Sequence, residues 1–497
     1  MKLRADTRIQ GFQIETFRHL LEIYADDLTV FLEPNSINLH CTVEVLSNFY
    51  KLSGLRISLK KTKAVWFGSS HDSNIELCPD LNLQWSKSFT LLGIDFDNKL
   101  ERMQDNFNRK IIKIEKLLNC WSYRYLTPFG KITIVKSLGL SKISHIALVI
   151  PNPSKNMIKK MNSLFYNFVW GGGSEKVNRE DAMLPEKWGG LGTPDIQKFW
   201  TAFKFSWLRR LLTTNSFWPT IIQMQVNKIL GNEISVTDIL KLGSSKLNQI
   251  SKQLKNDFWK QVFGSIISIT EGAAFCYPEK FLSTPFFHNN LVMRNNKVVK
   301  EVDFPELSGK IETISDFYIP GTTTLFQWVD FCDHYECNIS EEKFIDIRYI
   351  ITLAVQKLKI SSNRLIPASR PIKPILIDIA LMCTKGCRPY YLLLRKKNII
   401  LNKIYKRESK WHQELGYNLS IEFWNLSRKL CAKIRNDNKL KWLQYQILRN
   451  SLQTNYIVSH FNRNVTKQCY YCRETDEQIS HLFWSCMVVQ GFRNELE

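Results

Sequence analysis

The chain has 497 residues, a mass of 58.3 kDa and a formal net charge of +22. Hydrophobic residues make up 44% and aromatic residues 12%, so the sequence can bury hydrophobic cores and is not a disordered tail. The basic excess argues against a small-molecule metabolic enzyme. It favours a polyanionic partner, with nucleic acid ranked before a membrane surface.

The sequence shows no targeting pattern that would place the protein in a membrane or outside the cell. It has no run of about 18 uncharged apolar residues, and the opening MKLRADTRIQGF has no apolar signal-peptide core. We therefore expect no membrane partner and an intracellular protein, in the nucleus, the cytoplasm or both. The 12 cysteines are then expected to be reduced thiols or metal ligands.

The basic excess is concentrated in two segments. Lys99 to Trp170 holds 13 Lys/Arg and 3 Asp/Glu, and Arg395 to Asn450 holds 14 and 4, so each segment has a net charge of +10. This clustering predicts two surfaces that follow a nucleic-acid backbone. The alternative is two basic helical faces that only maintain solubility.

Residues 1–98 are expected to form short strands and one helix. The stretches His19–Tyr24 and Leu28–Leu32 flank an acidic turn and predict a hairpin. A helix is expected over Ser36–Leu52, because Pro34-Asn35 precede it and Ser53-Gly54 follow. The remaining expected strands are a pair, Leu55–Leu59 and Ala64–Phe67, and a further strand over Phe89–Phe96.

Residues 99–215 are expected to be mostly helical. Apolar residues recur there at helical spacing and basic residues lie off this stripe. The stripe is Phe107, Ile111, Ile114, Leu118 and Trp121, and the basic residues are Arg109, Lys110, Lys113 and Lys116. The glycine runs 171–173 and 189–192 predict turns, in preference to a phosphate-binding loop. A helical linker region is expected over 216–394, and a basic helical region with a cysteine cluster over 395–497.

Asp26 and Asp27 are the candidate catalytic residues. Nucleotidyl transfer needs carboxylates that hold two divalent ions about 4 Å apart, and Mg²⁺ prefers such hard oxygen ligands. A hairpin turn would let both side chains project beyond the strand ends. Taken alone the pair has a simpler interpretation, because aspartate is common in turns.

A candidate zinc site lies near the end of the chain. Cys469-x2-Cys472-x8-His481-x4-Cys486 supplies three thiolates and one imidazole at zinc-compatible spacing. The alternative is three buried thiols and an ordinary histidine. The aromatic residues Tyr470, Tyr471, Phe483 and Trp484 could stack on bases or cover the small core, and for the last two we favour the core. Two further clusters are weaker candidates. Cys332-His334-Cys337 has no evident fourth ligand, and Cys383-Cys387 is explained more simply by the helical spacing of buried thiols.

Several of these motifs together resemble the reverse transcriptases of non-LTR (LINE-type) retrotransposons, over residues 1 to about 200 and again at the cysteine cluster. Tyr24-Ala25-Asp26-Asp27 resembles the catalytic hairpin. Ser53 to Lys63 resembles the next motif, usually SGLKIN-x-x-KTE, with Ser58 and Lys63 departing from it. The other matching pieces are a primer-grip hairpin at Phe89–Ile94, a thumb pattern at Trp121, Leu126–Lys131 and Lys136, and a CCHC zinc module at Cys469–Cys486.

The resemblance implies a fold class and a set of residue roles. The fold would be α+β: an incomplete palm over 1–98, a helical thumb over 99–215, the linker, and a zinc-stabilised C-terminal module. The partners would be an RNA template and a DNA primer. The implied residues are Asp26 and Asp27 as Mg²⁺ ligands, Tyr24 and Lys61 as active-site support, Lys110, Lys113, Lys131 and Lys136 as nucleic-acid contacts, and Cys469, Cys472, His481 and Cys486 as Zn²⁺ ligands.

The resemblance also predicts an incomplete catalytic site. The family has another aspartate, on a strand well upstream of the hairpin, and a fingers region, whereas 23 residues precede Tyr24 here and Asp6 is their only aspartate. We therefore expect an RNA-directed DNA polymerase segment that is inactive alone. The alternatives are a non-catalytic nucleic-acid-binding remnant and a decayed reading frame without function.

Overall fold

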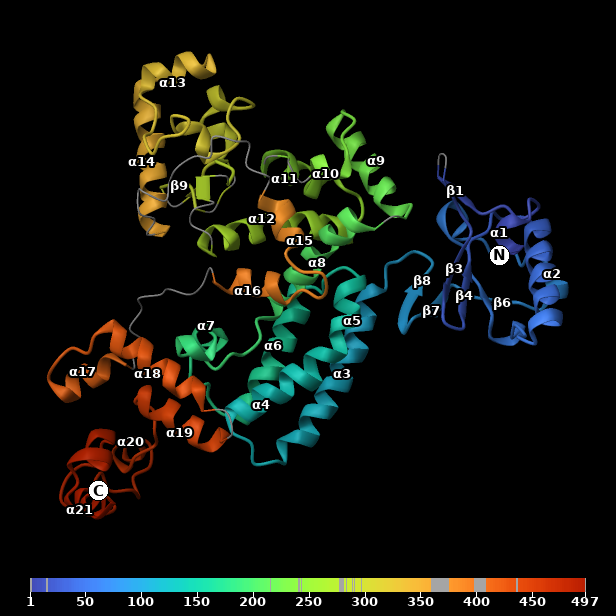
Figure 1. The fold of residues 1–497 in the computed structure, drawn as a ribbon. Coiled ribbons are helices and arrows are strands. Elements are labelled where there is room, and N and C mark those ends of the chain that lie inside the picture. The colour runs from blue at the N-terminus through green and yellow to red at the C-terminus, as the bar shows by residue number, and fades with distance from the viewer. Residues whose placement is uncertain are drawn as a thin grey trace.

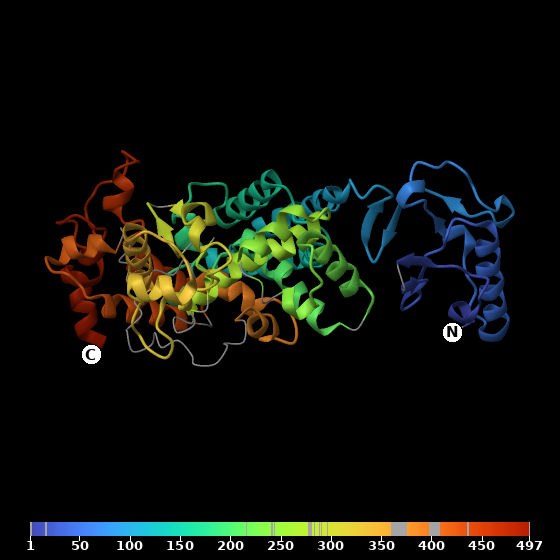
Figure 2. The same ribbon diagram turned by 90° about the horizontal axis from the view of Figure 1, so that it is seen from above.

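A computed structural model describes residues 2–496 apart from 15–16, 215, 240–241, 243, 277–280, 283, 288, 290, 296, 359–374, 397–407 and 435–436. The described chain is rich in helices and contains a few small two-stranded sheets. It begins in a small mixed unit, continues through a body of packed helices and ends in a tail of short helices (Figure 1). Figure 2 shows the N-terminal unit and the tail at opposite ends of the molecule. The helix-rich mixed fold expected from the sequence is confirmed at this coarse level.

The N-terminal unit consists of hairpins that surround one long helix. Its elements are α1 (Lys2–Ala5), β1 (Phe12–Ile14), β2 (Phe17–His19), β3 (Leu21–Tyr24), β4 (Asp27–Val30), α2 (Ser36–Ser53), η1 (Leu59–Lys61), β5 (Lys63–Ala64), η2 (Gly68–Ser70), η3 (Pro79–Leu81), β6 (Gln84–Trp85), β7 (Ser88–Leu91) and β8 (Ile94–Asp97). The expected helix is confirmed as α2. The Asn35 side chain accepts from the Ile37 N–H at its start, and Gly54 closes it at a φ of 75°.

The strand predictions are only partly correct. The hairpin around the acidic turn is confirmed, because β3 and β4 pair antiparallel with Tyr24 opposite Asp27. The expected pair Leu55–Leu59 and Ala64–Phe67 is wrong: the first stretch is irregular and leads into η1, and β5 pairs in parallel with β6. Phe89–Phe96 is a second hairpin, because Leu92 and Gly93 adopt left-handed conformations that reverse the chain.

The first part of the helical body is built around the apolar stripe predicted from the sequence. Its elements are α3 (Met103–Ser122), α4 (Pro128–Ile134), η4 (Val135–Leu140), α5 (Ser141–Val149), α6 (Lys155–Trp170), α7 (Arg179–Met183), η5 (Glu186–Trp188) and α8 (Ile196–Thr213). Phe107, Ile111, Ile114 and Leu118 are buried on one face of α3, and Trp121 packs at the edge of the same cluster. This cluster also includes Phe165 of α6 and Trp200 of α8, so α3 is a core helix of the body.

One helical stretch, Pro128–Val149, is long and apolar enough to cross a membrane. It consists of α4, η4 and α5 in direct succession. Val135, Ile143 and Ile146 on this stretch are buried against α3, α6 and α8. Packing inside the helical body therefore accounts for its apolar face.

A buried lysine links α8 to the end of α5. The Lys204 ammonium is fully buried and donates to the carbonyls of Ala147 and Ile150 at 2.7 and 2.8 Å. Ile150 is the C-cap residue of α5, so the lysine satisfies carbonyl groups that the helix end leaves free. Burial lowers the pKa of Lys204 from 10.5 to about 7.

Lys204 makes the stability of the helical body depend on pH. Between about pH 7 and 10.5 the unfolded lysine holds a proton that the folded lysine has released, so the free energy of unfolding rises with pH. Lys204→Met should lack this contribution, which has a slope of at most about 1.4 kcal/mol per pH unit. Urea unfolding of both proteins at several pH values measures the slope. Parallel profiles for wild type and variant would contradict the prediction.

The second part of the helical body contains two further cores. Its elements are α9 (Trp218–Leu230), α10 (Val236–Ile239), α11 (Ser244–Gln253), α12 (Asp257–Cys276), β9 (Met293–Arg294), β10 (Lys297–Val298), η7 (Glu301–Asp303), η8 (Pro305–Leu307), η9 (Ile314–Phe317), α13 (Trp328–Tyr335), α14 (Glu341–Leu358), α15 (Ile375–Leu381) and α16 (Arg388–Lys396). One core joins α8, α9, α11 and α12 to α15 and α16. The other is formed within residues 281–358, around η9, α13 and α14.

The last elements return to the first part of the body. They are α17 (Ser409–Leu415), α18 (Ile421–Lys433), α19 (Asn438–Leu448), α20 (Asn455–Ser459), η11 (His481–Ser485) and α21 (Met487–Leu496). Cys431 of α18 and Tyr445 of α19 are buried in one cluster with Phe129 of α4, Tyr166 of α6 and Leu191. Figure 1 shows α18 and α19 beside α4 and α7. We call this contact the docking interface.

The glycine run 189–192 forms part of the docking interface. Gly189 has a φ of 78°, and a Cβ there would lie 2.9 Å from Cδ of Arg428 on α18. A Cβ on Gly190 would lie 2.1 Å from the Leu184 carbonyl oxygen. The predicted turn is confirmed, and glycine is required because the chains approach so closely.

Candidate metal centre

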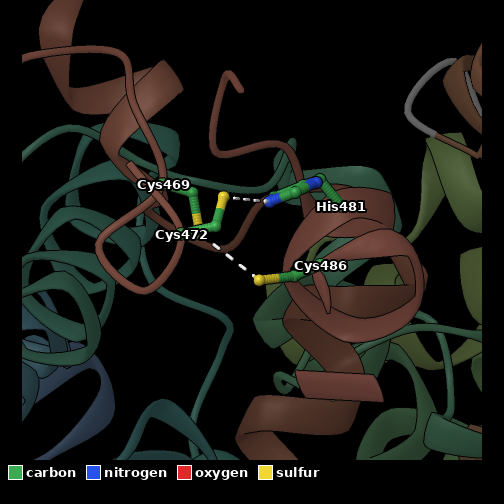
Figure 3. A group of neighbouring side chains, drawn as sticks. All are labelled: Cys469, Cys472, His481 and Cys486. Atoms are coloured by element: carbon green, nitrogen blue, oxygen red, sulfur yellow. Dashed lines mark hydrogen bonds between the residues drawn. The ribbon is translucent and has the colours of Figure 1, made fainter. Parts of the chain in front are cut away.

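The structure brings the four predicted zinc ligands together. The donor atoms of Cys469, Cys472, His481 and Cys486 all lie within 4.8 Å of one another. The Cys472 Sγ is 3.3 Å from His481 Nε2, and the Cys469 Sγ is 4.0 Å from the Cys486 Sγ (Figure 3). Three thiols and one imidazole at these separations fit the tetrahedral shell of Zn²⁺.

Two tight local structures position the four ligands. The first two cysteines lie in a loop closed by a bond from the Cys469 N–H to the Thr475 carbonyl, with Arg473 in a left-handed conformation. His481 and Cys486 lie at the two ends of the π-helical turn η11, where the Cys486 N–H donates to the His481 carbonyl. One turn of this wide helix places both side chains on the same side. A π-helical turn of this kind is common at functional sites.

The thiols differ in their electrostatic environment. The backbone N–H groups of Glu474 and Thr475 donate to Cys472 and lower its pKa from 9.0 to about 6, so this thiol is ready to act as a thiolate. Burial raises the pKa of Cys469, against opposing donation from the N–H groups of Cys472 and Tyr471. A bound cation would favour the thiolate at both positions.

Outer groups orient the ligands. The Thr475 hydroxyl lies 3.1 Å from His481 Nδ1 and 3.2 Å from Nε2, at the edge of the ring. The Ser485 hydroxyl lies 3.3 Å from Nδ1, which leaves Nε2 beside the Cys472 thiol. The buried carboxylate of Glu477 accepts from the backbone N–H groups of Tyr470 and Asn455, both at 2.8 Å. Glu477 thus ties the cysteine loop to the start of α20. This role of Glu477 could not be predicted from the sequence, because one glutamate in a polar loop has no distinguishing pattern.

The four ligands lie within a region of the chain that matches a known protein family. Residues 425–492 match a family described as zinc-binding in reverse transcriptase. The match begins in α18 and includes all four ligands. The C-terminal region of the chain is therefore related to reverse transcriptases. The family match and the four gathered ligands together support Zn²⁺ as the cofactor of this region.

The aromatic residues around the cluster fall into two groups. Phe483 packs against the small core formed by Trp411, Trp424 and Ile479, as expected from the sequence. Trp484 is 56% exposed, so the expectation that it covers the core is wrong. Tyr470 and Tyr471 are also exposed, and all three rings are available for stacking.

The acidic hairpin presents Asp26 and Asp27 at an exposed tip. The turn is tight, with Ala25 at a φ of 52°, and Tyr24 beside it is 68% exposed. Among the described residues no third carboxylate gathers with this pair, and Asp6 is instead held by Arg8 at 2.8 Å. The described residues alone therefore supply only two carboxylates at the hairpin tip. Lys61 is exposed on η1, and none of the hydrogen bonds or ion pairs described for this part of the chain joins it to the hairpin.

The four basic residues predicted to contact nucleic acid divide by location. Lys113 is exposed on the outer face of α3 and Lys110 is half-buried there. The Lys131 ammonium lies 5.6 Å from the Phe168 ring centre, and the Lys136 ammonium is near Gly192. Burial lowers the pKa of both Lys131 and Lys136, and for Lys136 the attraction of Glu186 opposes this. Lys131 therefore lies against the end of α6, and Lys136, whose side chain is partly exposed, lies beside Glu186 and Gly192 at the docking interface.

Part of the second basic segment is also internal. Arg428 and Arg449 are buried with Glu408, and the Arg428 Nε donates to Glu408 at 3.0 Å. Lys441 pairs with Glu186 of η5. These three cations are buried or paired and do not contribute to the basic surface predicted for Arg395–Asn450. Residues 397–407 and 435–436 of this segment lie outside the described residues.

The two lesser cysteine clusters do not form metal sites among the described residues. Cys337 is buried, and burial raises the pKa of its thiol. Arg209 donates to the Cys383 carbonyl at 3.1 Å, and burial raises the pKa of Cys387 to about 11. Cys332 and Cys337 pack in the core around α13 and α14, and Cys383 and Cys387 pack at the edge of the core that joins α8 to α15 and α16.

Proposed function

We propose that the chain is a segment of a LINE-type reverse transcriptase, an RNA-directed DNA polymerase, and that it binds nucleic acid without polymerising alone. The observation that carries the proposal is the Cys₃His cluster within a region that matches reverse-transcriptase zinc-binding domains. The tight acidic hairpin ahead of a helical body adds support. In this proposal residues 1–98 are palm, 99–215 thumb, 216–394 linker and 395–497 the basic zinc region.

The residue roles follow from this assignment. Asp26 and Asp27 are the carboxylates of the polymerase hairpin, with Tyr24 beneath the primer end and Lys61 near the triphosphate. The exposed face of α3, with Lys113, approaches the backbone of an RNA template paired with a DNA primer. The rings of Tyr470, Tyr471 and Trp484 stack on unpaired bases.

The chain alone should not incorporate nucleotides. The described residues supply two adjacent carboxylates at the hairpin and no further one beside them, so two metal ions cannot be held together. Supplying the purified chain with template–primer, dNTPs and Mg²⁺ tests this. Incorporation that Asp26→Asn abolishes would overturn the claim of inactivity and would support the polymerase assignment.

Nucleic-acid binding by the chain should depend on salt. Each phosphate contact to duplex contributes about −0.9 to the slope of log K against log salt concentration. Replacing Lys113 by glutamine should therefore make the slope shallower by about 0.9. Lys252→Gln is the matched control, because Lys252 is an exposed lysine on α11, outside both basic segments. If the binding constant of the wild-type chain does not change with salt concentration, the chain lacks phosphate contacts, and the alternative of a decayed reading frame without function is favoured.

A further inference from the structure

A second group of metal-binding side chains lies in the N-terminal unit. His40 lies on α2, Cys78 immediately precedes η3, and Asp80 lies within η3. Their donor atoms all lie within 4.8 Å of one another. We propose that these three residues bind one Zn²⁺-class divalent ion that fastens the loop around η3 to α2.

The distance between the imidazole and the carboxylate fits a shared metal ion better than a direct bond. His40 Nε2 and Asp80 Oδ1 are 3.7 Å apart, which is too long for a hydrogen bond. Two ligands at zinc bond lengths of about 2.0–2.1 Å in a tetrahedron are separated by about 3.3 Å. A small shift of either exposed side chain would bring the pair onto one ion.

The Cys78 thiol lies beside α2 without a metal ion. Cys78 is buried, and its Sγ lies 3.5 Å from the carbonyl oxygen of Ser36 in the first turn of α2. The backbone of Cys78 is left-handed, with a φ of 54°, and Pro79 follows directly. A left-handed conformation is uncommon at a non-glycine residue, and here the thiol of that residue lies within 4.8 Å of the donor atoms of His40 and Asp80.

The donor set selects the class of metal. One thiolate, one imidazole and one carboxylate suit Zn²⁺, whereas Mg²⁺ and Ca²⁺ prefer oxygen ligands alone. Three protein ligands leave a fourth position for water or an external ligand.

The N-terminal unit has only a small buried hydrophobic cluster among its described residues to stabilise it. Its buried hydrophobic cluster contains Leu3, Ile9, Leu20, Leu21 and Cys41. A metal ion that joins His40 to Cys78 and Asp80 closes a long loop and so stabilises the fold. The site is separate from the C-terminal cluster and does not depend on the function proposed above.

Titration of the metal-free full chain with Co²⁺ tests the inference. Two Co²⁺ ions should bind per chain, and four thiolates should contribute to the charge-transfer absorption: Cys78, Cys469, Cys472 and Cys486. Cys78→Ser should leave one ion per chain and remove about a quarter of this absorption, since it removes one of the four thiolates. Cys469→Ser should instead leave one ion whose spectrum shows a single thiolate.

Two surface variants guard against loss of folding. His40→Gln and Asp80→Asn replace exposed side chains and should each weaken the second Co²⁺ by at least about tenfold. Cys120→Ser, which removes an exposed thiol on α3 outside both clusters, is the control and should still bind two ions. Binding of one Co²⁺ by the wild-type chain, with Cys78→Ser unchanged in stoichiometry and absorption, would overturn the inference.

Discussion

Replacing Cys469 by serine is expected to unfold the tail from α20 onward while the helical body stays folded. Zinc binding to small structural sites contributes about 10–16 kcal/mol, and the tail buries few other apolar residues. In hydrogen exchange measured with zinc present, the protection of residues 455–496 should fall by several kcal/mol in opening free energy. Protection within α3 should not change.

Two controls make this result specific to the metal. Cys120→Ser removes an exposed thiol on α3 and should leave the tail protected. Removing zinc from the wild-type chain with a chelator should reproduce the loss seen with Cys469→Ser. A tail that stays protected in the chelated protein would show that packing, and not the metal, holds it together.

Replacing Glu408 by leucine is expected to loosen the docking interface. Glu408 is fully buried and its carboxylate neutralises Arg428, with Arg449 3.9 Å away. Removing one member of a buried ion pair leaves an uncompensated charge and costs about 3–5 kcal/mol. The urea midpoint of the C-terminal region should fall accordingly, and α18 and α19 should lose hydrogen-exchange protection.

The control for Glu408→Leu is a substitution on α18. Glu422→Leu removes an exposed glutamate of α18 and should change stability by less than about 1 kcal/mol. Adding Arg428→Met and Arg449→Met to Glu408→Leu should recover much of the loss, because an apolar set can replace a buried ionic one. Equal effects of Glu408→Leu and Glu422→Leu would show that the buried charges do not hold the interface.

Local patterns predicted the features that depend on nearby residues. The helix α2 has its cap residues adjacent in sequence, the α3 stripe repeats at helical spacing, and the zinc ligands lie within 18 positions. In each case the physical cause is short-range: capping, amphipathic burial or loop closure by a metal.

The environment of the basic residues could not be predicted in the same way. Lys441 pairs with Glu186, 255 positions earlier, and the sequence pattern of α19 does not specify this partner. The short strands were mispredicted for a related reason. β5 pairs with β6 across η2 and η3, and pairing between distant short strands is decided by tertiary contacts.

The docking interface has a consequence for the order of folding. Phe129, Tyr166 and Leu191 complete their buried cluster only when Cys431 and Tyr445 arrive. During synthesis the helices α4 and α6 therefore carry an uncovered apolar face until most of the chain has been made. Contacts of such long sequence separation slow folding and expose intermediates to aggregation. A ribosome-bound chain that ends before α18 should thus need a chaperone more than the finished protein does.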